Sequence, residues 1–210
     1  AALFAFRSPL SKGAILADEV GLGKTIEAGL VISQKWAERK RKILIIVPSN
    51  LRKQWNQELL DKFFLSSVIL ENASFNQEIK KGNLNPFEQG KVVICSYHFA
   101  RKMDVYIKKI QWDLVVIDEA HRLRNVYKPS SKIANAIKEA VAHAPKILLT
   151  ATPLQNTLLE LFGLVSIIDD YTFGDLKSYK SQFSHLDCSE NFDDLKERLK
   201  PVCIRNLRRQ

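Results

Sequence analysis

The stretch GAILADEVGLGKT, residues Gly13–Thr25, decides the fold. It opens with a short apolar run, Ala14–Ala17, continues through a glycine-containing turn, and ends on Lys24 and Thr25. A tight glycine turn between a strand and a helix lets successive backbone N–H groups converge on phosphate oxygens, and the helix N-terminus adds partial positive charge. The pattern therefore predicts a strand, a phosphate-binding turn and a helix, in that order.

The ligand that suits such a turn is ATP with Mg²⁺. Lys24 would reach the β- and γ-phosphates and assist catalysis, and the Thr25 hydroxyl would ligate Mg²⁺. The usual pattern begins with glycine, whereas Asp18 stands at that position here. The alternative is a glycine turn before a surface helix whose lysine and threonine face water. The residues expected to contact ATP are Asp18, Glu19, Val20, Gly21, Leu22, Gly23, Lys24 and Thr25.

A second motif, DEAH at Asp118–His121, directly follows the apolar run Leu114–Ile117. Two carboxylates at the carboxyl end of a buried strand lie where α/β sheets bind their ligands. Asp118 would hold Mg²⁺ and so serve catalysis, and Glu119 would orient and polarise the attacking water. His121 is a candidate for coupling the nucleotide to another part of the protein. The alternative is a helix cap with a surface histidine.

A third motif, LLTATPLQN, begins at Leu148 and also follows an apolar run. Its small hydroxyl residues would hydrogen-bond the DEAH carboxylates and relay the state of the nucleotide. The alternative is a threonine-rich turn ended by Pro153. The candidate coupling residues of this segment are Thr150, Ala151, Thr152 and Gln155.

Short apolar runs alternate with longer amphipathic ones, which predicts βαβ units around a mostly parallel sheet. Predicted strands are Ala14–Ala17, Ile43–Val47, Val68–Leu70, Val92–Cys95, Trp112–Asp118 and Lys146–Thr150. Predicted helices are Lys24–Glu38, Leu51–Phe63, Ser130–Ala142, Thr157–Ile168 and Phe192–Leu199. In the first helix, Ile26, Leu30 and Val31 have the spacing of a buried face. Pro48 and Ser49 are expected to end one strand and cap the next helix.

The bulk composition limits the class of protein. The chain has 210 residues and a net charge of +9, which allows a polyanionic partner but does not require one. Its three cysteines are far apart, so neither a disulfide framework nor a zinc site is predicted, and a reducing compartment fits best. Because no apolar stretch approaches the ~18 residues of a membrane span, we expect a soluble protein with no membrane partner.

Taken together, the three motifs resemble those of superfamily 2 helicases and translocases. The stretch GAILADEVGLGKTIEAG at Gly13–Gly29 is similar to the SWI/SNF-type branch, and so are LTATPLQN at Leu149–Asn156 and IRNLRR at Ile204–Arg209. The Val20 variant is similar to bacterial members, including the RNA-polymerase-associated ATPases. The resemblance implies a three-layer α/β RecA-like P-loop NTPase domain with a mostly parallel central sheet. Residues 1–210 would be the first, ATP-binding lobe of a longer protein.

The resemblance also implies what the longer protein acts on. The partners would be DNA, with duplex favoured, a second RecA-like lobe that supplies arginines, and RNA polymerase or another nucleoprotein complex. The function would be ATP-driven translocation and remodelling, in bacterial cytoplasm at the nucleoid, and the isolated lobe would hydrolyse ATP poorly. Two alternatives stay open: a DEAH-type strand-separating helicase and a non-catalytic nucleic-acid-binding module.

The nucleic-acid contacts are expected at two further strand ends. The segment VPSNLRKQW at Val47–Trp55 is similar to the family's motif Ia, and the segment ICSY ends another predicted strand. Hydroxyl groups, a helix N-terminus and cationic side chains there would contact phosphates. The alternative is a solvated helix start, with Trp55 packed in the core. The candidate nucleic-acid-binding residues are Pro48, Ser49, Arg52 and Ser96.

Overall fold

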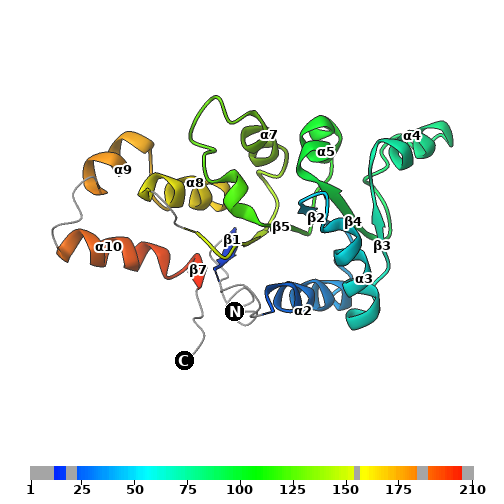
Figure 1. The fold of residues 1–210 in the computed structure, drawn as a ribbon, viewed down its shortest axis with the longest axis horizontal. Coiled ribbons are helices and arrows are strands. Elements are labelled where there is room, and N and C mark those ends of the chain that lie inside the picture. Colours follow the sequence, from blue (N-terminus) through cyan, green and yellow to red (C-terminus); the bar gives the residue numbers. More distant parts are fainter. Residues whose placement is uncertain (1–11, 18–22, 154–156, 184–188, 205–210) are drawn as a thin grey trace.

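The computed structural model describes residues 12–17, 23–153, 157–183 and 189–204, without the side chains of residues 189–192. In this part of the chain, seven strands form one sheet in the order β3-β4-β2-β5-β6-β1-β7 (Figure 1). Every neighbouring pair among them is parallel. The strands are β1 (Gly13–Leu16), β2 (Ile43–Val47), β3 (Ser67–Ile69), β4 (Val92–Ser96), β5 (Leu114–Asp118), β6 (Lys146–Leu149) and β7 (Cys203–Ile204).

Helices cover both faces of the sheet, so the molecule has three layers (Figure 1). They are α2 (Lys24–Ala37), α3 (Arg52–Phe63), α4 (Asn72–Lys80), α5 (Tyr97–Lys102), α6 (Asp104–Lys108), α7 (Lys132–Ala140), α8 (Leu158–Ile168), α9 (Leu176–Phe183) and α10 (Ser189–Leu199), with the short 3₁₀ helix η1 at Ala120–Leu123. None of the described helices is long and apolar enough to cross a bilayer.

Alternate residues of the central strands enter two separate cores. Ile43 and Ile45 of β2 pack with α2 and α3, whereas Leu44 and Ile46 pack with α5, α7 and α8. Strands with no polar residue are those that parallel sheets bury on both faces. The predicted three-layer α/β fold is therefore confirmed, and the predicted strands all exist with small differences at their ends.

Two local predictions about helices were wrong. Leu30 is 49% exposed, because the buried face of α2 is formed by Ala28, Val31 and Ile32, which puts Leu30 on the outer side. Ser49 does not cap α3, since that helix begins at Arg52 with Leu51 in the capping position and no side-chain cap.

Besides η1 and β7, four short α-helices were not predicted: α4, α5, α6 and α9. They owe their place to tertiary contacts between aromatic rings. Phe75 of α4 lies 5.9 Å from Phe99 of α5 and 5.0 Å from Tyr106 of α6, measured between ring centroids. Phe173 and Phe183 similarly surround Tyr179 of α9. Helices this short are marginal without such packing, and no local periodicity reveals it.

Candidate active site

The three sequence motifs follow adjacent strands of the sheet, β1, β6 and β5, so they meet at one edge. Parallel strands place their carboxyl ends together, and ligands bind at that edge. Between β1 and β5 lies Thr150, fully buried, whose N–H donates to the carbonyl of Leu16 at 3.1 Å. The Thr150 Oγ1 accepts from the N–H of Thr152 at 3.1 Å. Ala151 follows Thr150 directly, whereas the predicted Gln155 lies outside the described residues.

Helix α2 begins at Lys24, directly after Gly23. Gly23 has φ 83°, a left-handed conformation that glycine adopts at no steric cost. The start of α2 has no side-chain hydrogen-bond cap, as far as its described residues show. Its first N–H groups are therefore suited to an anion. Of the predicted ATP contacts, residues Asp18–Leu22 lie outside the described part of the chain.

A cavity of about 380 Å³ joins this helix start to the DEAH carboxylates. Such a volume lies in the range of small-ligand sites. The residues that line it are Gly23, Lys24, Thr25, Ile26, Leu51, Gln54, Trp55, Glu58, Lys62, Asp118 and Glu119. A threonine hydroxyl and a carboxylate are the hard oxygen ligands that Mg²⁺ prefers. The donor set fits ATP with Mg²⁺.

Asp118 is the most constrained side chain of this cavity. Its Oδ1 accepts from the N–H of Glu119 and its Oδ2 accepts from the indole Nε1–H of Trp55, both at 2.8 Å. The hydroxyl of Tyr97 donates to the Asp118 backbone carbonyl at 2.5 Å. Burial raises the pKa of the Asp118 carboxyl, while the Trp55 donor and the positive charge of Lys24 oppose that rise. Burial also raises the pKa of Tyr97, so its hydroxyl keeps the proton that it donates.

Glu119 leaves the sheet in an unusual backbone conformation. Its φ is 53° and its ψ is 45°, in the left-handed region that non-glycine residues seldom adopt. Strain of this kind gathers at functional sites. The turn leads directly into η1 and leaves the Glu119 side chain 36% exposed in the cavity, with His121 Nδ1 3.1 Å from its Oε2. The adjacent carboxylates thus have different surroundings: Asp118 is held by hydrogen bonds on both oxygens, whereas Glu119 is partly exposed to the cavity beside His121.

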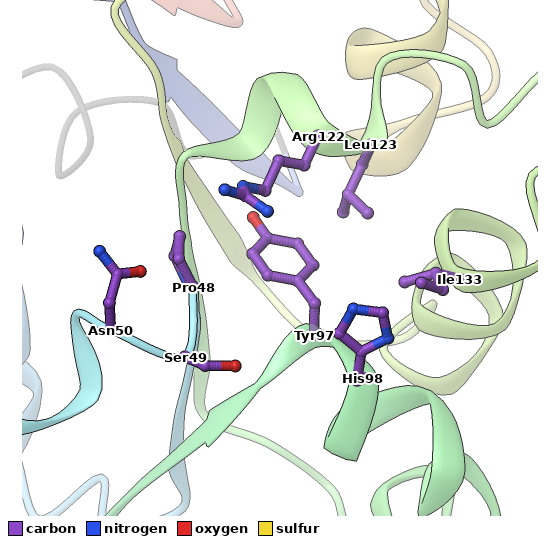
Figure 2. Close-up of a pocket in the computed structure, with 8 residues that line it drawn as sticks. All are labelled: Pro48, Ser49, Asn50, Tyr97, His98, Arg122, Leu123 and Ile133. Carbon is purple, nitrogen blue, oxygen red and sulfur yellow. The ribbon is translucent and has the colours of Figure 1, made fainter.

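A second cavity, of about 490 Å³, is lined in part by Arg122 and Leu123, which follow the DEAH motif in the chain (Figure 2). Figure 2 shows Tyr97 at its centre, with its hydroxyl toward Arg122 and the ring of His98 beside it. Pro48 and Ser49, both predicted to bind nucleic acid, lie on its opposite side (Figure 2). The complete lining is Pro48, Ser49, Asn50, Tyr97, His98, Arg122, Leu123 and Ile133.

The other two predicted contacts, Arg52 and Ser96, line an adjoining groove of about 290 Å³ that shares His98. Arg52 Nη1 pairs with Glu71 Oε2 at 2.8 Å, and its Nε donates to the Ser49 carbonyl at 3.0 Å. The Ser96 hydroxyl accepts from the N–H of Phe99 and so caps α5. Both side chains therefore also have structural partners.

Several residues that line these two cavities were not among the predicted site residues. Four of them carry polar groups with a role in the function proposed below: Trp55, Tyr97, His98 and Arg122. The prediction that Trp55 is buried is confirmed, because its side chain is 2% exposed, but it also holds Asp118. A signal existed for three of them: Tyr97 and His98 follow Ser96 directly, and Arg122 follows His121 directly.

Comparison with known proteins agrees with this geometry. The family model described as the SNF2-related domain matches residues 4–210. The chain belongs to the SNF2-related domain family. The fold is similar to that of the Sulfolobus solfataricus SWI2/SNF2 ATPase core in complex with dsDNA, with a TM-score of 0.80. The two sequences are 23% identical, and the match covers 100% of this chain and 43% of that chain.

Two curated relatives of this SNF2-related domain are bacterial. The RNA polymerase-associated protein RapA of Serratia proteamaculans is 38% identical over 173 residues, which cover 80% of this chain and 18% of that protein. The uncharacterized ATP-dependent helicase YqhH of Bacillus subtilis is 38% identical over 200 residues, which cover 93% of this chain and 33% of that protein. The matched part of the chain thus spans 18% of the length of one relative and 33% of the other.

Proposed function

We propose that this chain is the ATP-binding lobe of a DNA-dependent ATPase that translocates on duplex DNA and remodels nucleoprotein complexes. The observation that carries the proposal is the cavity in which Lys24 and Thr25 line the same space as Asp118 and Glu119. Those four residue types, on a helix start and a strand end, are the parts that phosphoryl transfer to water requires.

Each residue has a distinct task in the proposed reaction. The N–H groups at the start of α2 and the ammonium of Lys24 bind the phosphates of ATP. The Thr25 hydroxyl and the Asp118 carboxylate would hold Mg²⁺, which supplies charge neutralisation to the phosphates when bound. Glu119 orients the attacking water, because its carboxylate lines the cavity and is more exposed than that of Asp118. Thr150, whose N–H donates to the Leu16 carbonyl at the end of β1, and Thr152 would relay the state of the nucleotide.

The proposal includes a second lobe. In our reading residues 1–210 form the first lobe, and a partner lobe of the same protein contributes arginines to the transferring phosphoryl group. An arginine of this kind raises the rate by about 10³–10⁵ in related phosphoryl-transfer systems. The 210 residues alone would therefore bind ATP and hydrolyse it poorly.

The second cavity is the proposed nucleic-acid site. Ser49, His98 and Arg122 offer a hydroxyl, an imidazole and a guanidinium to phosphate oxygens, and phosphate contacts are what position a protein on DNA. Duplex DNA is favoured because one similar structure is in complex with dsDNA. The similarity to RapA makes RNA polymerase a candidate partner. Such a protein would act at the nucleoid, in the bacterial cytoplasm.

The test is steady-state ATP hydrolysis by the full-length protein, with and without duplex DNA. We expect stimulation by duplex DNA and loss of activity in Lys24→Ala and Glu119→Gln. Efficient strand displacement would instead indicate a DEAH-type helicase. If both variants kept normal ATP hydrolysis and normal activity in vivo, the proposed ATPase function would be refuted. The chain would then be interpreted as a non-catalytic nucleic-acid-binding module.

A further inference from the structure

Asp118 is held by hydrogen bonds from both helical layers. Trp55 reaches its carboxylate from α3, on one face of the sheet, and Tyr97 reaches its backbone carbonyl from α5, on the other. Both donors are nearly excluded from solvent, at 2% and 5% exposure. Each donor is also connected to the second cavity, where the nucleic acid is proposed to bind.

The connection through α3 is a short series of hydrogen bonds. The carbonyl of Pro48, which lines the second cavity, accepts from the N–H of Leu51 at 2.9 Å. The carbonyl of Leu51 accepts from the N–H of Trp55 at 2.9 Å. The Trp55 indole then donates to Asp118 Oδ2 at 2.8 Å. A displacement of the Pro48 turn therefore moves the first turn of α3, and with it the indole that positions the carboxylate.

The connection through α5 is direct. The Tyr97 ring is at the centre of the second cavity, next to His98 and Arg122 (Figure 2). Its hydroxyl makes the 2.5 Å bond to the Asp118 carbonyl at the end of β5. A phosphate seated against His98 and Arg122 would contact the turn that carries Tyr97, and close packing transmits such a shift without absorbing it.

We propose that Trp55 and Tyr97 are positioning residues through which nucleic acid in the second cavity sets the placement of Asp118, and thereby the rate of ATP hydrolysis. The inference rests on the proposed function, because it assigns the route by which DNA stimulates the ATPase. Neither residue needs to touch ATP or DNA phosphate for this role. The inference predicts that variants of these residues change the stimulation of ATP hydrolysis by DNA, and that this change is separate from any change in affinity for DNA.

The chain offers a matched control for each residue. Trp112 is also a buried tryptophan, 6% exposed, whose indole donates to the Ile107 carbonyl at 3.0 Å. Tyr179 is also a buried tyrosine, 1% exposed, whose hydroxyl donates to the Leu158 carbonyl at 3.0 Å. Neither control lines the cavities described above. Replacing each by phenylalanine removes the same chemical group from the same kind of environment.

The experiment compares four variants of the full-length protein: Trp55→Phe, Tyr97→Phe, Trp112→Phe and Tyr179→Phe. For each, kcat is measured with and without saturating duplex DNA, together with KM for ATP and Kd for the duplex. The ratio of the two kcat values is expected to fall about 5- to 10-fold in the first two variants, the size of a typical coupling energy. The ratio stays within about 2-fold in the two controls, as do their KM and Kd values. In Trp55→Phe and Tyr97→Phe, the fall in the ratio is larger than any change in KM or Kd.

Four results would overturn the inference. The stimulation ratio could be unchanged in both variants, or it could fall equally in the controls, which would indicate a general loss of packing. Loss of duplex affinity in place of stimulation would make Tyr97 a binding residue only. If the wild-type protein hydrolysed no ATP or ignored DNA, the proposed function itself would fail first. Thermal melting shows whether Trp55→Phe is misfolded. If it is, the stimulation ratio of Tyr97→Phe, a nearly isosteric substitution, tests the inference by itself.

Discussion

Gly163, in the middle of α8, marks the closest approach between that helix and the segment after the DEAH motif. A Cβ built on Gly163 would lie 2.0 Å from the carbonyl oxygen of Arg124 and 2.9 Å from its carbonyl carbon. Next to this contact, Arg124 Nε and Glu160 Oε1 are 3.5 Å apart, and the Glu160 side chain is buried. Helix α8 is therefore fixed against η1, the turn that carries His121.

The substitution Gly163→Ala puts two effects in opposition. Alanine in a helix interior is favoured over glycine by about 1 kcal/mol. The added methyl group would need α8 or the backbone at Arg124 to move, because the obstacle is main chain and cannot rotate away. Overpacking of this kind typically costs about 1–3 kcal/mol, and a 2.0 Å approach belongs at the upper end. We expect a net loss of about 2 kcal/mol in the free energy of unfolding.

Gly29→Ala is the matched control, since Gly29 is also a helix-interior glycine with a close neighbour. That neighbour is the ring of Phe63, whose Cε2 lies 2.2 Å from the ideal Cβ position. A side chain at a helix end can turn aside, so the net change should lie within about 1 kcal/mol of zero. Urea titration of both variants, with equal m-values, measures the difference. If Gly163→Ala were as stable as Gly29→Ala, the claim that the main chain at Arg124 blocks a side chain at position 163 would be refuted.

Further predictions concern the site and the pH dependence. Glu119→Gln should lower kcat about 10²-fold or more with nucleotide affinity preserved, and Lys24→Ala should weaken nucleotide binding in equilibrium titrations. Arg52→Ala should weaken duplex binding for all sequences and reduce the slope of log Kd against log salt by about 1; an unchanged slope would limit Arg52 to its pairing with Glu71. Burial lowers the pKa of Lys146 from 10.5 to about 8. The unfolded state then holds more protons between pH 8 and 10.5, so the free energy of unfolding rises with pH across that window, by up to about 3 kcal/mol relative to Lys146→Met. Urea titrations of the wild-type protein and Lys146→Met across this pH range measure the effect, and a difference in the free energy of unfolding that does not change with pH would contradict it.

The sequence predicted the parts of the fold that are coded locally. Apolar runs such as Ile43–Val47 identify central strands because a strand buried on both faces carries no polar residue. The spacing in Lys24–Ala37 identifies α2 as a helix, although it gave the wrong exposure for Leu30. The motifs were predicted as strand-end residues, and in the structure Lys24 and Asp118 line one cavity.

Contacts between distant segments could not be predicted in this way. The Trp55–Asp118 bond joins residues 63 positions apart, and β7 is only two residues long and exists because it pairs with β1. No local pattern separates a tryptophan that fills the core from one that also donates to a carboxylate. Proximity in the sheet supplies that information, because α3 follows β2, and β2 is the neighbour of β5.

The position of β5 explains why the DEAH motif lines one cavity while Arg122 and Leu123, directly after it, line the other. It is the middle strand of the described sheet, with β3, β4 and β2 on one side and β6, β1 and β7 on the other. A residue at the end of the middle strand can be reached from both helical layers, and Asp118 is reached by Trp55 from one and Tyr97 from the other. In the proposed mechanism, these two contacts make Asp118 the residue through which a change in one cavity reaches the other.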